Sequence, residues 1–120
     1  MNKLSKVLIS VALMAVAPFA LACDYPAPPK SLPEGASASK EEMLAGVKVV
    51  AAYQEKMSEY LSCIEADQIF ATQALADDDE DGKKQLKTMS NKKYNAAVDE
   101  QTRTVELFNA EIRAFKSRSK

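Results

Sequence analysis

The stretch from residue 39 to residue 75 constrains the fold more than any other part of the chain. Its apolar side chains recur at alternating steps of three and four residues, the spacing of a helix with one apolar stripe. The stripe contains Met43, Val47, Val50, Met57, Leu61, Ile64, Ala71 and Leu75, with Gln54 and Gln68 at its two remaining positions and Leu44, Tyr53, Tyr60 and Phe70 beside it. A stripe this regular predicts a core-facing helix rather than a ligand-binding surface.

A capping box marks the start of this helix. In Ser39-Lys40-Glu41-Glu42 the Ser39 hydroxyl can accept a hydrogen bond from the Glu42 amide, and the Glu42 carboxylate can accept one from the Ser39 amide. Glu41 and Glu42 also suit the positive end of the helix dipole. We therefore expect this helix to begin at residue 40.

A second apolar stripe predicts a second helix. Its positions, again in steps of three and four, are Tyr94, Val98, Gln101, Val105, Phe108, Ile112 and Phe115. Before it, five consecutive acids from Asp77 to Asp81 repel one another, and Gly82 permits a left-handed turn. Long helices with a short connection pack antiparallel. The expected fold is all-α: a long antiparallel two-helix hairpin (about 40–76 and 83–117) with an extended proline-rich N-terminal segment packed along it.

The charge distribution agrees with antiparallel pairing. Residues 40–81 hold three basic and eleven acidic residues, net −8, whereas residues 82–120 hold ten basic and four acidic residues, net +6. Antiparallel packing would place Lys116 and Arg118 near Glu41 and Glu42. Exposed ion pairs are worth about 0–1 kcal/mol each, so we expect them to favour one register more than to add stability.

The first 22 residues have the pattern of a cleavable signal peptide. Lys3 and Lys6 form a basic start, residues 7–21 are apolar apart from Ser10, and Ala20-Leu21-Ala22 is a small-x-small cleavage site. The apolar run is short for a membrane span, although a retained anchor is the alternative. We expect three parts, namely a signal peptide (1–22), an extended proline-rich segment (23–39) and a helical hairpin domain (40–120), and a periplasmic or secreted protein.

The mature chain holds two cysteines, Cys23 and Cys63, and an even number in an exported protein favours a disulfide. Residues 24–38 contain four of the five prolines and are expected to be extended. Residues 23–39 can then span ~53 Å, more than the ~36 Å helical rise from Ser39 to Cys63. The segment can therefore run back along the helix and close the bridge, with Tyr25 and Leu32 as apolar contacts.

Two alternatives to the bridge remain at the sequence level. Cleavage after Ala22 makes Cys23 the first mature residue, as in membrane-anchored lipoproteins whose N-terminal cysteine carries the lipid. The residues before Cys23 differ from that signal, because Leu21 and Ala20 stand where a small residue and a larger aliphatic residue are usual. Two free thiols are the other alternative. The protein would contact a membrane only if Cys23 is lipidated.

Part of the chain resembles a group of small exported proteobacterial proteins. The resemblance rests on Pro33-Glu34-Gly35-Ala36-Ser37-Ala38-Ser39, on Glu42-Met43 and on Tyr60-Leu61-Ser62-Cys63. Proteins of this group have a signal peptide, a cysteine near the mature start, a Pro-x-Gly-Ala-x-Ala-Ser/Thr segment, a Glu-Met helix start and a Tyr-x-x-Cys. The resemblance covers residues 23–65 and implies export and pairing of the two cysteines. It implies no activity and no catalytic residue.

The acidic run is the one candidate for a metal site. Asp77, Asp79, Asp81 and Gly82 match positions 1, 3, 5 and 6 of an EF-hand calcium loop. The remainder departs from that motif, because Lys84 takes the usual apolar position and Thr88 the position of the bidentate glutamate. We expect a solvated acidic turn, with divalent-cation binding by Asp77, Asp79 and Asp81 as the alternative.

Residue types argue against catalysis. The chain has no histidine, which removes Ser-His-Asp and Cys-His catalysis. The mature chain has 14 basic and 17 acidic residues, net −3, unlike the basic face of a nucleic-acid binder. We expect no catalytic residue, no cofactor and no nucleic-acid partner. The expected protein is an exported helical binding or structural protein with an unknown protein partner or a homodimer, and a small periplasmic chaperone-like protein is an alternative.

Overall fold

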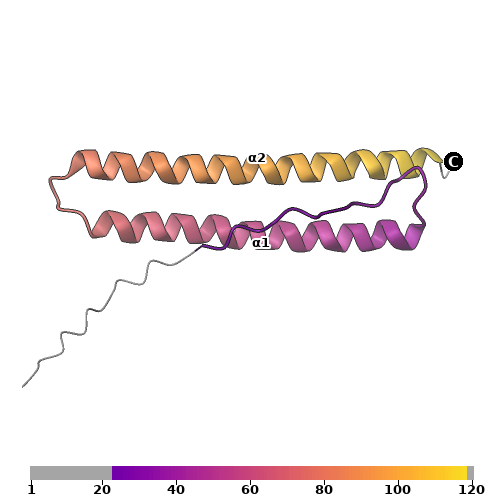
Figure 1. Ribbon diagram of the computed structural model, residues 1–120, viewed down its shortest axis with the longest axis horizontal. Coiled ribbons are helices and arrows are strands. Elements are labelled where there is room, and N and C mark those ends of the chain that lie inside the picture. The colour runs from indigo at the N-terminus through magenta and orange to yellow at the C-terminus, as the bar shows by residue number, and fades with distance from the viewer. Residues whose placement is uncertain (1–22, 119–120) are drawn as a thin grey trace, which may run out of the picture.

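A computed structural model of the chain describes residues 23–118. It forms two long helices, α1 (Lys40–Gln73) and α2 (Glu80–Arg118), which lie side by side and antiparallel (Figure 1). Residues 23–39 run along the pair in an extended path, and no strand occurs in the described part of the chain. The expected all-α hairpin is therefore confirmed. The predicted signal peptide, residues 1–22, lies outside the described residues.

The predicted capping box is present at the start of α1. The Ser39 amide donates to the Glu42 carboxylate at 2.6 Å, and the Glu42 amide donates to the Ser39 hydroxyl at 3.1 Å. The backbone hydrogen bond holds the pKa of the Glu42 carboxyl below its usual range, because it favours the ionised form.

The buried seam of α1 differs from the predicted stripe on one side. Its buried residues are Met43, Gly46, Val50, Tyr53, Met57, Tyr60 and Ile64. Half of the prediction is confirmed, since Met43, Val50, Met57 and Ile64 are buried. Leu61 packs partly buried against the same cluster. Val47 is wrong, because it is exposed, and Tyr53 and Tyr60, which were expected beside the stripe, are buried together with Gly46. The proline-rich segment packs on the tyrosine side and leaves the other side open.

The buried seam of α2 contains small side chains that hydrophobic patterning overlooks. Ser90, Ala97, Thr104 and Phe108 are buried. Phe108 belongs to the predicted stripe, whereas Ser90, Ala97 and Thr104 do not. Ala97 packs in one cluster with Tyr53, Met57, Tyr60 and Ile64 of α1. Small residues on α2 thus make room for large ones on α1, the alternation that close helix packing requires.

The connection between the helices spans residues 74–79, three residues earlier than the predicted 77–82 and equally long. Asp79 caps α2, because its carboxylate accepts from the Gly82 amide at 2.8 Å. The predicted left-handed turn at Gly82 is wrong: Gly82 lies in the first turn of α2 and no described glycine has a positive φ. The Lys83 ammonium donates to the Asp77 carbonyl at 2.6 Å and pairs with Glu80 at 3.1 Å.

The predicted ion pairs at the open end of the hairpin do not form. Among residues 23–118, neither Lys116 nor Arg118 makes an ion pair with Glu41 or Glu42. Instead, the Arg118 guanidinium donates to the Ala38 carbonyl and lies 5.1 Å from the centre of the Phe115 ring. Arg118 thus binds the turn that leads into α1. A backbone carbonyl is already fixed in place, whereas an ion pair with Glu41 or Glu42 would also cost the conformational entropy of the acidic side chain.

Candidate functional site

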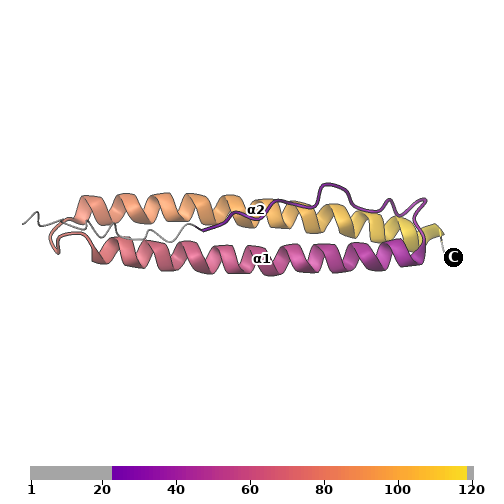
Figure 2. The same ribbon diagram turned by 60° about the horizontal axis from the view of Figure 1, so that its bottom comes forward.

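The proline-rich segment, residues 23–39, covers one face of the hairpin. It starts beside the middle of α1 and ends near the C-terminus of α2 (Figures 1 and 2). Its first anchor is the disulfide between Cys23 and Cys63, whose Cα atoms are 5.7 Å apart. The predicted pairing is therefore present in the structure. A thioether-linked lipid needs the same Cys23 sulfur, so one molecule cannot carry both the bridge and that lipid.

An aromatic contact follows the disulfide. The Tyr25 ring meets the Tyr60 ring edge to face, with centroids 5.0 Å apart and planes at 80°. Burial raises the pKa of the Tyr25 hydroxyl, and the nearby Glu100 carboxylate raises it further. Leu32 packs against the cluster that contains Met43 and Phe108. Both predicted apolar contacts of the segment are thus confirmed.

Two glycines let the segment approach the helices. A Cβ on Gly46 would lie 2.7 Å from a Pro33 ring carbon and 2.9 Å from the Phe108 ring. A Cβ on Gly35 would collide with the backbone of Glu111 and Phe115. The Gly35 amide also donates to the Glu111 carboxylate at 2.7 Å. The segment is therefore fixed to α1 at one end and to α2 at the other.

Within residues 23–118, the proline-rich segment does not cover the opposite face of the hairpin. An open groove crosses it between the helices, lined by Gln54 of α1 and by Val98, Gln101, Thr102, Val105 and Glu106 of α2, and no residue of the proline-rich segment lines this groove. Leu44 and Val47, in the first half of α1, are 53% and 46% exposed. The structure thus leaves one long side of the hairpin open.

The open side carries no charge at its central positions. On α1 these positions recur in three-four steps at Leu44, Val47, Ala51, Gln54, Ser58 and Leu61. On α2 the matching steps give Asn95, Val98, Thr102, Val105, Asn109 and Ile112. We call these twelve residues the uncharged face. Leu61, Val105 and Ile112 pack against the core clusters of the hairpin. Seven of the twelve positions are exposed, namely Leu44, Val47, Ala51, Ser58, Asn95, Thr102 and Asn109.

Sequence reasoning identified only part of the uncharged face. Val47, Leu61, Val98, Val105 and Ile112 were assigned to core stripes, and the small polar residues between them were not noticed. On α2 the sequence did contain a signal: Asn95, Thr102 and Asn109 on one side of the stripe are uncharged, whereas the other side carries Lys93, Glu100 and Glu111.

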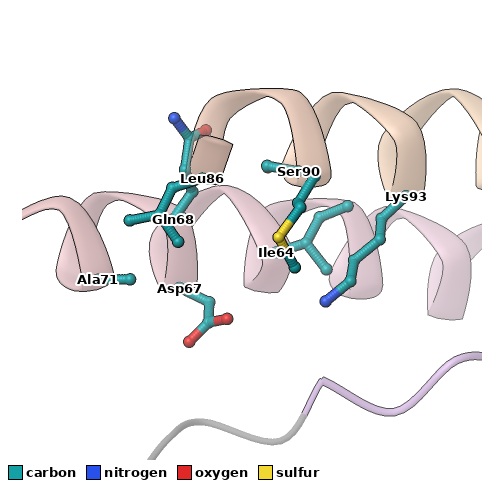
Figure 3. A pocket seen from close by; sticks show the side chains of 8 residues that line it. Ile64, Asp67, Gln68, Ala71, Leu86, Ser90 and Lys93 are labelled. Atoms are coloured by element: carbon teal, nitrogen blue, oxygen red, sulfur yellow. The ribbon is translucent and has the colours of Figure 1, made fainter. Parts of the chain in front are cut away.

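A cleft of about 90 Å³ lies toward the hairpin tip, on the tip side of the Cys23–Cys63 bridge where the proline-rich segment starts (Figure 3). Ile64, Ala71 and Leu86 give it an apolar floor, and Asp67 and Lys93 stand at its mouth. Gln68, Met89 and Ser90 complete its lining.

The acidic connection does not form a calcium loop. No group of three potential metal ligands comes together within residues 23–118, Asp77, Asp79 and Asp81 included. Asp79 instead caps α2, and Asp81 lies in the first turn of that helix. Helix α2 begins too early for the three carboxylates to converge. Also within the described part, neither helix is long and apolar enough to cross a membrane.

One buried polar atom lies in the core between the covered and open faces. The Tyr53 side chain is 4% exposed, and its hydroxyl has no hydrogen-bond partner among the described residues. Burial raises the pKa of this hydroxyl, whereas the nearby Thr104 hydroxyl acts in the opposite direction. Thr104 itself donates to the Glu100 carbonyl at 3.0 Å.

Comparison of the chain with protein-family models, with curated proteins and with solved structures found no match. The site therefore has to be interpreted from its own geometry.

Proposed function

We propose that this chain is an exported, non-enzymatic protein of the cell envelope, periplasmic or secreted, that acts through protein–protein contacts made by its uncharged face. The proline-rich segment, the disulfide and the small seam residues of α2 together build a rigid rod. A rigid rod presents the face without an ordering cost on binding, which favours association.

The uncharged face carries this proposal. Interface cores are depleted in charged residues, and exposed apolar side chains gathered on one side of a helix pair are typical of a helix-binding surface. Leu44 and Val47 are about half exposed on this face, and the groove further along it is lined by two valines, three uncharged polar side chains and Glu106, whose polar groups can hydrogen-bond across an interface.

Export is supported by the pattern of residues 1–22, by the resemblance to exported proteobacterial proteins and by the Cys23–Cys63 bridge, because disulfides form and persist mainly in oxidising compartments. Intact mass of the protein purified from its native host tests this point. We expect a chain that begins at Cys23 and gains two daltons on reduction. A full-length chain, or a mass excess equal to a lipid, would contradict the proposal.

The binding surface is tested by site-specific photo-crosslinking in cells. Val47 and Val49 are a matched pair, since both are valines of α1 with 46% and 47% exposure, and only Val47 lies on the uncharged face. A photoreactive residue at position 47 should give discrete crosslinked bands that the same residue at position 49 does not give. Equal patterns from the two positions would overturn the assignment of the face.

A further inference from the structure

The proline-rich segment divides into two parts that are held to the helices by different means. Within residues 23–118, no hydrogen bond joins residues 24–34 to either helix. The bonds begin at Gly35, whose amide donates to Glu111, and continue at Ala38, whose carbonyl accepts from Arg118. We call residues 23–31 the outer part and residues 32–39 the inner part. The inner part is thus anchored without the disulfide.

Few contacts hold the outer part besides the disulfide. The Tyr25 ring meets Tyr60 but remains 49% exposed, and of residues 23–31 Pro26 alone is buried. In the proposed mature chain Cys23 is also the first residue, and chain ends detach unless they are tied down. The Cys23–Cys63 bridge is therefore the main attachment of the outer part to α1.

The outer part covers two tyrosines of the core. Tyr60 lies against Tyr25, and Tyr53 lines a hollow together with Ala27 and Pro29. The Tyr53 hydroxyl has no hydrogen-bond partner among the described residues. Burial raises the pKa of this hydroxyl, and the nearby Tyr25 raises it further. The covered state therefore leaves a buried polar group unpartnered, and water can satisfy this group once the outer part lifts.

The bridge is accessible in the folded chain. Cys23 and Cys63 are only partly buried, and both line an open hollow of about 520 Å³. Thiol–disulfide exchange begins when a thiolate attacks one sulfur of the bridge, so its rate depends on access to that sulfur. The hollow gives a dithiol this access without prior unfolding of the helices.

We infer that the Cys23–Cys63 bridge is a reducible latch: its reduction by a dithiol releases the outer part and uncovers Tyr53 and Tyr60, while the inner part and both helices stay in place. One thiolate of the reductant attacks a sulfur of the bridge and displaces the other as a thiolate. The second thiol then closes a disulfide within the reductant, so the protein gains two electrons and two protons. The latch lies on the covered side and does not depend on the uncharged face.

Hydroxyl-radical footprinting of the mature protein tests the latch. The oxidised protein is compared with protein that is reduced by dithiothreitol and alkylated with iodoacetamide, both without denaturant. We expect labelling of Tyr53 and Tyr60 to rise at least ~3-fold and labelling of Phe108 to change less than ~1.5-fold. Phe108 is the matched control, because it is 4% exposed, as Tyr53 is, but packs with Leu32 of the inner part.

A variant without the bridge gives a second test. Cys23→Ser/Cys63→Ser should show the uncovered labelling pattern with or without dithiothreitol, and circular dichroism should show that its helices remain. The inference is overturned if the wild-type bridge is reduced only in denaturant, or if labelling of Tyr53 and Tyr60 does not rise in either protein. It is also overturned if Phe108 labelling rises as much as that of Tyr53 or if helicity is lost, because the bridge would then hold the whole domain together.

Discussion

The Gly35 amide donates a hydrogen bond of 2.7 Å to the Glu111 carboxylate, across 76 residues of sequence. This bond attaches the proline-rich segment to α2, whereas the Cys23–Cys63 bridge attaches the same segment to α1. The two helices are therefore joined twice, once by the connection at residues 74–79 and once by the segment itself. This second attachment completes a hairpin that by itself would have little interior.

Removing the Glu111 carboxylate should detach the segment from α2. Glu111→Ala leaves the Gly35 amide without its protein acceptor, and we expect a loss of about 1–2 kcal/mol in the free energy of unfolding, measured by chemical denaturation. Glu65→Ala, an exposed glutamate of α1, is the control and should change the free energy by less than ~0.5 kcal/mol. Equal effects of the two substitutions would show that the Gly35 contact contributes nothing.

Gly46 should resist replacement although it lies within a helix. Alanine is favoured over glycine in a helix by about 1 kcal/mol, so propensity alone predicts that Gly46→Ala stabilises α1. The new Cβ would meet Pro33 at 2.7 Å and Phe108 at 2.9 Å. We expect a net loss on the order of 1 kcal/mol from this overpacking. Ala45→Gly, at an exposed position, measures propensity alone, and a stabilised Gly46→Ala would contradict the close packing.

Opening the disulfide should loosen the segment and destabilise the whole domain. The bridge closes a loop over a sequence separation of 40 residues, and the chain-entropy model gives about 4 kcal/mol for such a loop. We expect the double variant Cys23→Ser/Cys63→Ser to lose up to this amount and to match the reduced wild type in thermal unfolding. An unchanged Tm in the double variant would exclude a stabilising role for the bridge.

Tyr53→Phe should be neutral or stabilising, despite the burial of this side chain. The hydroxyl is buried without a hydrogen-bond partner among the described residues. Removing a buried unpartnered polar group avoids its desolvation penalty, so we expect a change between 0 and about +1 kcal/mol in the free energy of unfolding. Tyr60→Phe is the comparison within the same cluster. A clear loss in Tyr53→Phe alone would mean that a solvent molecule or partner group occupies the site.

The capping box should make α1 sensitive to acid. Because the pKa of Glu42 is lowered in the folded chain, its contribution to stability is present above the pKa of about 4.5 that it has when unfolded. That contribution is lost as the pH falls through the lower folded value. We expect Tm to fall less steeply with acidification in Glu42→Gln than in the wild type. Parallel Tm profiles for the two proteins would refute this role of the carboxylate.

Much of the fold could be predicted from the sequence because it depends on local chemistry. Ser39 and Glu42 form a cap from four neighbouring residues, and the three-four spacing from Met43 to Ile64 defines a helix by itself. The even cysteine count and the reach of the proline-rich segment favoured the Cys23–Cys63 bridge. The prediction that α2 begins after Gly82 was also wrong for a local reason. Asp79 caps the helix, so Glu80, Asp81 and Gly82 form its first turn.

The sequence by itself therefore determined two helices, their antiparallel order and the extended segment that ties them. Only the tertiary structure decided which side of each helix is buried. Val47 belongs to the predicted stripe and Tyr53 lies beside it, and the spacing alone does not show that Tyr53 is the one that is buried. The choice depends on the face to which the proline-rich segment is bound, and that in turn depends on the contacts of Gly35 and Gly46 with distant backbone and side chains. Burial on that face leaves the opposite, uncharged face open.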